Sequence, residues 1–317
     1  MLQALVSTAS QFLHDLNRSL LGERRPAVQP VKNGAAPKYL PLERILVTDG
    51  VGRTLFEEYA AHRHEARGDE ETGWVLLGLR DTREAVVLAT LPAGAERDAS
   101  VAHVQFNSNG QALGSRIVRQ MDRRLTILGV VHTHPGSLRH PSEADYRGDS
   151  QWVKQLRGGQ GVFGIGTADG TPTSGTLFAH QPRPHLQCLG ELCLSWYSLQ
   201  FGDTNYRPLP VELTIGPDLA RPLHCVWPMI EAHAERLERL HCQQAGVTFG
   251  VSAGDKGPAL AVNIPLAQPD NALRVLLEGE EVRYYLARGD ELLAAACPEE
   301  RVDRGVYLLL AELAGQG

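Results

Sequence analysis

Lysine is nearly absent from this 317-residue sequence. It occurs only at Lys32, Lys38, Lys154 and Lys256, so almost every basic residue is arginine. Codon bias in a GC-rich bacterial genome explains this usage, with selection against self-modification as the alternative. An excess of positive charge is also lacking, because the formal net charge is −6. The chain therefore has no general attraction to phosphate backbones or anionic lipids, and we expect neither nucleic acid nor a membrane as a partner.

Cysteine is scarce as well. The five cysteines are an odd number and all lie beyond residue 187, which is not the pattern of a secreted disulfide framework. Residues 1–25 have no basic start, contain Asp15 and lack an apolar run long enough to span a membrane. The sequence thus predicts neither a signal peptide nor an anchor, and a cytoplasmic protein.

A chain of this length with 43% hydrophobic residues is long enough for about two domains. At the start, apolar residues recur at steps of three and four, which predicts an amphipathic helix that docks on its own chain or on a partner. A segment rich in proline, glycine and charge follows it. The predicted organisation is a helix at 1–21, a linker at 22–40, a first domain at 41–186 and a second domain at 187–317.

The first domain alternates predicted strands with predicted helices, which indicates an α/β fold. We expect its strands at 45–48, 74–79, 85–91, 126–131, 162–165 and 176–179, and its helices at 52–64, 111–125 and 143–156. The second domain has a proline-rich stretch at 207–222, an amphipathic helix at 230–243 and alternating strands at 259–264 and 282–286. Its pattern predicts an α+β domain, and the lack of a catalytic motif there favours a role in partner recognition.

Two histidines stand at the end of an apolar strand. The sequence runs from that strand directly into His132, Thr133, His134 and Pro135. Because side chains on a strand alternate between its faces, His132 and His134 project to the same side. Pro135 ends the strand and turns the chain.

A carboxylate returns to the same place from the next helix. Ser142 begins that helix and Asp145 lies one turn into it. Two imidazole nitrogens and one carboxylate oxygen on a tetrahedral ion leave a fourth position for water, as in catalytic zinc sites. Taken singly, each histidine would be a surface residue, and Ser142 with Asp145 would be a helix capping box.

The whole segment resembles the JAMM (MPN-plus, or JAB-domain) metalloprotease signature, which is His-x-His-Pro, six residues, then Ser-x-x-Asp. His132, His134, Pro135, Ser142 and Asp145 fill every fixed position. The resemblance covers residues 41–184. It implies a JAMM/MPN-type mixed sheet flanked by helices, with the C-terminal α+β domain and the N-terminal amphipathic helix as additions.

The family also has an upstream glutamate in the pattern Glu-x-x-Gly-x-x-x-Gly. Glu71 matches it with Gly78 seven residues later, although Trp74 stands where the first glycine is usual. Glu70 would place Gly73 correctly but Leu77 where the last glycine belongs, so we favour Glu71.

By this resemblance, His132, His134 and Asp145 hold one zinc ion per chain. Glu71 is then the general base that takes the proton from the attacking water, and Ser142 donates to the oxyanion. The implied function is an isopeptidase or peptidase that cleaves after the C-terminus of a ubiquitin-like protein. The implied partners are a ubiquitin-like protein or its conjugates, and E1-like or E2-like enzymes of a bacterial modification system. Some bacterial systems of this kind serve antiviral defence.

Three other interpretations stay open from the sequence. The first is a catalytically silent MPN scaffold, and the second is a peptidase that trims sulfur-carrier proteins. The third is a RadC-like, DNA-associated protein, which the net charge disfavours. A second zinc site at His224-Cys225 and His241-Cys242 is disfavoured, because adjacent pairs lack the usual ligand spacing.

Overall fold

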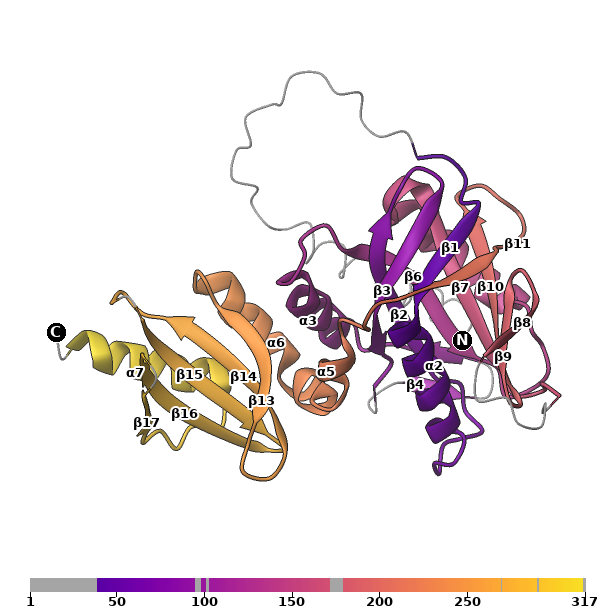
Figure 1. Ribbon diagram of the computed structural model, residues 1–317. Coiled ribbons are helices and arrows are strands. Elements are labelled where there is room, and N and C mark those ends of the chain that lie inside the picture. Colours follow the sequence, from indigo (N-terminus) through magenta and orange to yellow (C-terminus); the bar gives the residue numbers. More distant parts are fainter. Residues whose placement is uncertain are drawn as a thin grey trace, which may run out of the picture. The chain divides into compact units, whose positions relative to one another are not determined.

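The computed structural model describes residues 39–94, 98–100, 103–171, 179–268, 270–289 and 291–315 (Figure 1). The chain forms two compact units. The first comprises the residues up to Ser108 and Asp122–Arg221, and the second comprises Asn109–Met121 and the residues from Pro222 onward. The helix predicted at 1–21, nearly all of the predicted linker and most of the strand predicted at 176–179 lie outside the described residues.

A ten-stranded mixed sheet forms the first unit, in the order β12-β1-β3-β2-β6-β7-β10-β9-β8, with β11 paired to β10. The strands are β1 (Arg44–Thr48), β2 (Gly73–Arg80), β3 (Glu84–Pro92), β6 (Thr126–Thr133), β7 (Gln160–Thr167), β8 (His180–Arg183), β9 (Leu186–Leu189), β10 (Leu192–Gln200), β11 (Arg207–Pro208) and β12 (Val211–Thr214). A separate hairpin joins β4 (Asp98–Ser100) to β5 (His103–Gln105).

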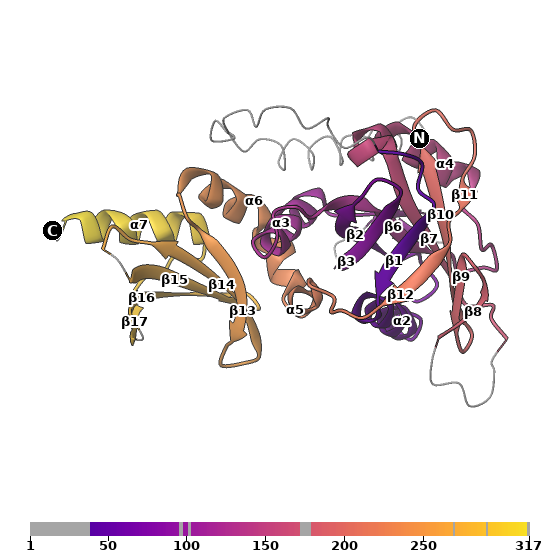
Figure 2. The same cartoon turned by 45° about the horizontal axis from the view of Figure 1, so that its top comes forward.

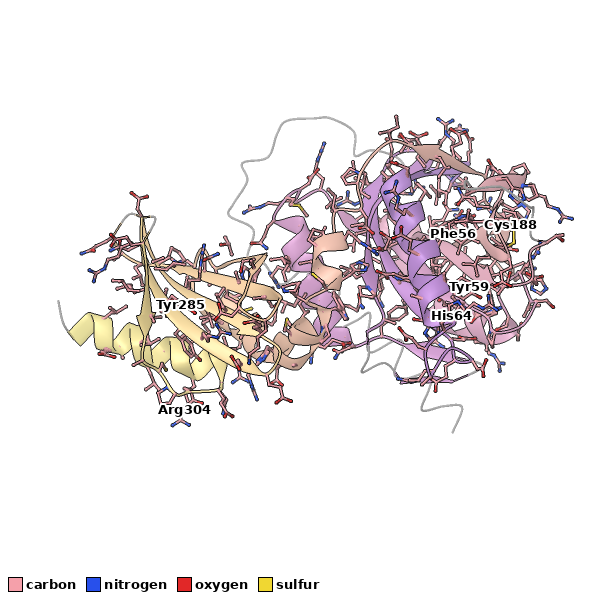
Figure 3. The ribbon with its side chains drawn as sticks, turned by 60° about the horizontal axis from the view of Figure 1, so that its bottom comes forward. Phe56, Tyr59, His64, Cys188, Tyr285 and Arg304 are labelled. Carbon is pink, nitrogen blue, oxygen red and sulfur yellow. A yellow bond between two sulfur atoms is a disulfide. The ribbon has the colours of Figure 1, made fainter. Side chains whose placement is uncertain are left out.

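Helices cover both faces of this sheet (Figure 2). Helix α2 (Asp49–His62) packs on one face, where Leu55 and Tyr59 join the same apolar cluster as Val131 and Trp196 from the sheet. Figure 3 shows Phe56 and Tyr59 on this helix. Helix α4 (Glu143–Trp152) lies over the other face and is followed by the short 3-10 helices η1 (Val153–Gln155) and η2 (Arg157–Gly159). The predicted α/β class and the mixed sheet flanked by helices are confirmed.

Close approach of neighbouring strands explains one glycine of the predicted motif. Gly78 lies at the irregular step where β2 changes its register with β3, and a Cβ atom there would overlap the carbonyl oxygen of Val86. Glycine is therefore needed at this position for the strands to approach.

The predicted domain boundary at residue 186 is wrong. Residue 186 begins β9, and the next strand, β10, pairs with β7 over eight residues from Cys193 to Gln200. The chain then returns through β11 to β12, which pairs in parallel with β1 at the far edge of the sheet. The first unit consequently extends to Arg221.

An antiparallel sheet forms the second unit, in the order β13-β14-β15-β16-β17. Its strands are β13 (Thr248–Ala253), β14 (Pro258–Pro265), β15 (Asn271–Glu278), β16 (Glu281–Arg288) and β17 (Glu291–Ala295), and its helices are α5 (Arg221–His224), which starts at the unit boundary, α6 (Trp227–Gln243) and α7 (Val302–Gly315). The predicted α+β character is confirmed. Helix α3 (Ser108–Arg119) belongs to this unit although it lies between β5 and β6 in the sequence.

Two of the cysteines form a disulfide. Cys188 on β9 lies directly opposite Cys193 on β10, with their Cα atoms 4.2 Å apart (Figure 3). Both are buried, and their separation of five residues did not predict the bond. Among the described residues, no helix is long and apolar enough to cross a membrane.

Candidate metal centre

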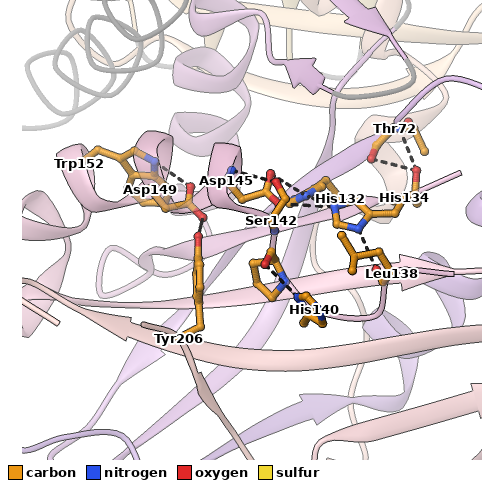
Figure 4. A network of polar contacts seen from close by, with 12 residues as sticks. Thr72, His132, His134, Leu138, His140, Ser142, Asp145, Asp149, Trp152 and Tyr206 are labelled. Atoms are coloured by element: carbon orange, nitrogen blue, oxygen red, sulfur yellow. Dashed lines mark hydrogen bonds and ion pairs between the residues drawn. The ribbon is translucent and has the colours of Figure 1, made fainter. Parts of the chain in front are cut away.

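The end of β6 places two imidazoles on the α4 face of the sheet. His132 pairs with Gly73 of β2 and Ile165 of β7, so it lies within the hydrogen-bonded ladder. The backbone nitrogen of His134 donates to the carbonyl of Gly166 at 2.8 Å, which continues the ladder as far as the residue before Pro135. The Nε2 atoms of the two histidines are 3.1 Å apart, as their spacing on one strand predicts (Figure 4).

Asp145 reaches the histidines from the first turn of α4. Ser142 caps this helix: its side chain accepts a hydrogen bond from the backbone of Asp145, and its own backbone donates to the Asp145 carboxylate. The capping box is therefore formed by two residues of the predicted metal motif, Ser142 and Asp145. The reciprocal bonds hold the Asp145 carboxylate toward the histidines.

The three side chains have the geometry of a metal-ligand set. The carboxylate oxygens of Asp145 lie 3.2 Å from Nε2 of His132 and 3.5 Å from Nε2 of His134. Zinc bonds of about 2.0–2.1 Å in a tetrahedron separate ligand atoms by about 3.3 Å. Among the described residues, this is the one group of three or more histidine, cysteine or acidic side chains whose donor atoms all lie within 4.8 Å. The group fits zinc.

His134 also makes the kind of hydrogen bond that prepares a histidine to bind a metal ion. Its Nδ1 lies 2.8 Å from the carbonyl oxygen of Leu138, which can accept only from a protonated nitrogen. The proton is thereby placed on Nδ1, and the Nε2 lone pair faces His132 and Asp145. Such outer hydrogen bonds fix the tautomer of metal-binding histidines.

Burial and charge act on these groups in opposite directions. Burial lowers the pKa of His132, but the hydrogen bond and charge of Asp145 outweigh it and raise the pKa to about 9. Burial also disfavours the ionised form of Asp145, yet the hydrogen bond and the charge of His132 hold the pKa of that carboxyl well below its usual range. The carboxyl of Asp145 therefore stays ionised, and its negative charge suits it to bind a metal cation.

Glu71 and Glu70 have different surroundings. Glu71 is buried, only 4% exposed, and its charge contributes to raising the pKa of His132. Thr72, the next residue, exchanges hydrogen bonds with Thr133 between the two histidines. Glu70 instead pairs with Arg67 at 2.6 Å, and its carbonyl oxygen accepts from Nε2 of His62 at 2.9 Å. Glu71 is thus a buried carboxylate whose charge acts on His132, while Glu70 pairs with Arg67.

Trp74 occupies the position where the family pattern has glycine. Its ring is almost fully buried under α2, and its indole nitrogen donates to the carboxylate of Glu58 at 2.7 Å. Because side chains of β2 alternate between its faces, this ring lies on the face opposite the histidines. The departure from the pattern therefore leaves the metal group unobstructed.

The sequence did not point to buried Asp149 or to partly buried Tyr206, which lie beside the site. Asp149, one turn after Asp145, accepts hydrogen bonds from the hydroxyl of Tyr206 at 2.7 Å and from the indole of Trp152 at 3.2 Å (Figure 4). The only local signal was an acidic residue at the fourth position after Asp145. Tyr206 lies 57 residues from Asp149 and beyond the predicted domain, so no spacing could have linked them.

Comparison with known proteins agrees with the site. A family model described as prokaryotic homologs of the JAB domain matches residues 53–178, which include the metal group and Glu71. No curated protein matches the chain. Solved structures do match, among them the solution structure of a protein from Desulfitobacterium hafniense, with 17% identity, a TM-score of 0.37, and coverage of 55% of this chain and 95% of that chain. The first unit of this protein thus carries a domain of the prokaryotic JAB family, of the JAMM/MPN type.

Proposed function

We propose that the protein is a zinc-dependent isopeptidase or peptidase that cleaves after the C-terminus of a ubiquitin-like protein, in precursor processing or in deconjugation. The observation that carries the proposal is the convergence of His132, His134 and Asp145 at ligand distances. Buried Glu71 lies two residues before the neighbouring strand, β2. JAB domains also include non-catalytic members. This chain, however, has the three metal-ligand side chains and the glutamate that hydrolysis requires, which supports a catalytic role.

His132, His134 and Asp145 would hold the zinc ion. When bound, zinc supplies Lewis-acid chemistry, polarising a carbonyl group and lowering the pKa of water to about 7. Glu71 would take a proton from the attacking water and later give one to the leaving amine. Ser142 accepts the Asp145 backbone hydrogen bond with its oxygen, which leaves its own hydroxyl proton to donate to the developing oxyanion.

Burial of the ligands favours a thin, extended substrate. His132 and His134 are only 7% and 6% exposed, so the convex surface of a folded protein cannot bring a peptide bond to both. The C-terminal tail of a ubiquitin-like protein is an extended chain that can enter and form strand-like hydrogen bonds. E1-like and E2-like enzymes, which make such conjugates in bacterial systems, are the proposed further partners.

The test uses the zinc-loaded full chain and two substrate sets. One set contains bacterial ubiquitin-like proteins with a residual C-terminal extension, and the other contains the same proteins joined to a lysine side chain. Intact-mass measurement should show loss of the extension or of the lysine adduct, and Glu71→Gln should show neither. A zinc-loaded protein that binds these modifiers and cuts none of them would favour the scaffold alternative.

A further inference from the structure

Tyr206 lies outside the segment that matches the JAB family and yet reaches the helix that carries Asp145. It follows β10 and directly precedes β11. Its hydroxyl donates to one oxygen of Asp149 at 2.7 Å, and the indole nitrogen of Trp152 donates to the other oxygen at 3.2 Å. Both oxygens of a buried carboxyl are therefore satisfied, one helical turn after Asp145.

Aromatic neighbours hold the Tyr206 ring in place. Phe163 of β7 meets it edge to face at 5.4 Å between ring centroids, and Tyr146 and Tyr197 meet it at 6.3 and 6.5 Å. Such edge-to-face pairs fix the orientation of a ring as well as bury it. Burial raises the pKa of Tyr206 and the charge of Asp149 adds to this effect, so that the hydroxyl keeps its proton for donation.

A second hydrogen bond joins α4 to the same segment. The hydroxyl of Tyr146, which immediately follows Asp145, donates to the carbonyl oxygen of Asp203 at 3.0 Å. Residues 203–206 thus contact α4 at two positions, Tyr146 and Asp149. Closer to the metal group, the capping box at Ser142 fixes the first turn of the same helix.

We propose that Tyr206 and Asp149 are positioning residues for the metal centre, holding α4 so that Asp145 completes the ligand set with His132 and His134. This proposal rests on the proposed zinc site. Its physical basis is that metal ligands must lie within about 0.2 Å of their ideal distances, while the carboxylate of Asp145 moves with the helix that carries it. A small rotation of α4 would separate that carboxylate from the two histidines.

Substitutions can separate a hydrogen-bond role from a charge role. The amide introduced by Asp149→Asn could still accept from Trp152 and could donate to the Tyr206 hydroxyl oxygen, so both contacts survive without the charge. Asp149→Ala removes both contacts, and Tyr206→Phe removes only the hydroxyl. Tyr284→Phe is the matched control, because Tyr284 is a buried tyrosine of the second unit whose hydroxyl donates to the Glu299 carbonyl at 2.9 Å.

The experiment measures two properties of the full-length variants. Zinc affinity comes from competition with a chromophoric chelator, and ligand geometry comes from the visible absorption of the protein loaded with Co²⁺. We expect Tyr206→Phe and Asp149→Ala to bind zinc at least about tenfold more weakly, as is typical when a hydrogen bond that orients a metal ligand is lost. Both variants should also show altered Co²⁺ spectra. Asp149→Asn and Tyr284→Phe should retain the wild-type affinity and spectrum.

Two results would overturn the proposal. One is a Tyr206→Phe protein with wild-type zinc affinity and Co²⁺ spectrum. The other is an Asp149→Asn protein as impaired as Asp149→Ala, which would assign the effect to charge. The rescue by asparagine keeps the proposal testable even if Asp149→Ala fails to fold. A wild-type chain that takes up no zinc would instead refute the proposed function on which this inference rests.

Discussion

Glu71 and Glu70 are adjacent carboxylates with opposite environments, and their variants should differ accordingly. Glu71 is buried beside His132, whereas Glu70 is paired with Arg67. Replacing Glu71 by glutamine should lower the rate of peptide cleavage by about a hundredfold or more, because a general base typically contributes about 10²–10⁴-fold. Zinc content should stay at one ion per chain, since Glu71 is not among the proposed ligands. Turnover and elemental analysis of the same sample test both statements.

Glu70→Gln is the matched control for this prediction. It makes the same chemical change one residue away, and the pair that it disturbs is partly exposed and worth about 0–1 kcal/mol. Cleavage should remain near the wild-type rate. An inactive Glu70 variant beside an active Glu71 variant would show that the glutamate position inferred around Trp74 is wrong.

Zinc uptake should release a proton and weaken as the pH falls. The pKa of His132 is raised from 6.5 to about 9 in the metal-free chain, so the ring is protonated at pH 7, and only the neutral ring can bind a metal. Below the raised pKa, affinity should fall by about tenfold per pH unit. Proton release measured with a weakly buffered indicator, together with affinities between pH 6 and 8, tests this. Affinity that is flat across this range would contradict it.

The candidate ligands could be predicted because they are local in sequence. His132 and His134 lie on one strand, and Asp145 follows in the next helix, so strand alternation and helix capping place all three. Tyr206 could not be found in this way, because its contact with Asp149 forms only when the segment after β10 folds back on α4. Long-range contacts of this kind have no signature in the spacing of residues.

At the scale of elements, the stability of helix α4 depends on its N-cap, Ser142, which can be recognised in the sequence. Ser142→Ala should destabilise the protein by about 1 kcal/mol through loss of the cap. If Ser142 also donates to the oxyanion, cleavage by the zinc-loaded variant should fall by about a hundredfold. Thermal unfolding and single-turnover cleavage measure the two effects, and Ser142→Thr, which keeps a hydroxyl, should rescue both. A variant that loses only stability would restrict Ser142 to capping.

Elements with clear periodicity were predicted well, and the remaining ones failed for physical reasons. The strands β2, β3 and β6 and the helix α6 differ from their predicted bounds by only a few residues. The predicted helix at 111–125 is displaced toward the N-terminus and ends at Arg119. Strand β10 was not predicted at all. It is buried on both faces, so its serines and apolar residues do not alternate, and no period of two identifies it.

At the scale of the whole molecule, the two units are not successive in sequence. Helix α3 is encoded between two strands of the first unit but belongs to the second. There Arg116 forms two hydrogen bonds with Glu238 of α6, and its side chain is only 10% exposed. Gln120 similarly exchanges hydrogen bonds with the backbone of Phe249 on β13. The second unit therefore needs α3, and a C-terminal fragment that begins after residue 186 or 221 would lack this helix.

Arg116→Ala should destabilise the second unit by about 1–3 kcal/mol, because it leaves partly buried Glu238 without this charged partner. The control is Arg124→Ala, whose side chain is 76% exposed and pairs with Asp122, for which about 0–1 kcal/mol is expected. Hydrogen exchange of amides in β13 to β16, followed by mass spectrometry on the full chain, resolves the effect. Equal protection in the two variants would show that α3 does not stabilise this unit.

The last prediction concerns the extent of the first unit. A fragment of residues 41–186 matches the domain predicted from sequence, but it lacks β10, which pairs with β7 along its whole length, and Tyr206. Its exposed β7 edge would be an aggregation site. A fragment of residues 41–221 contains the same α3 and lacks the same later residues, so the two differ only in residues 187–221.

We expect the longer fragment to unfold cooperatively and to bind one zinc ion, and the shorter fragment to do neither. Circular dichroism melting, light scattering and zinc analysis compare them directly. A monomeric 41–186 fragment with a cooperative melt and a full complement of zinc would show that β10 to β12 are dispensable. In that case the chemistry of the metal centre would be contained in the segment that matches the JAB family and its immediate flanks.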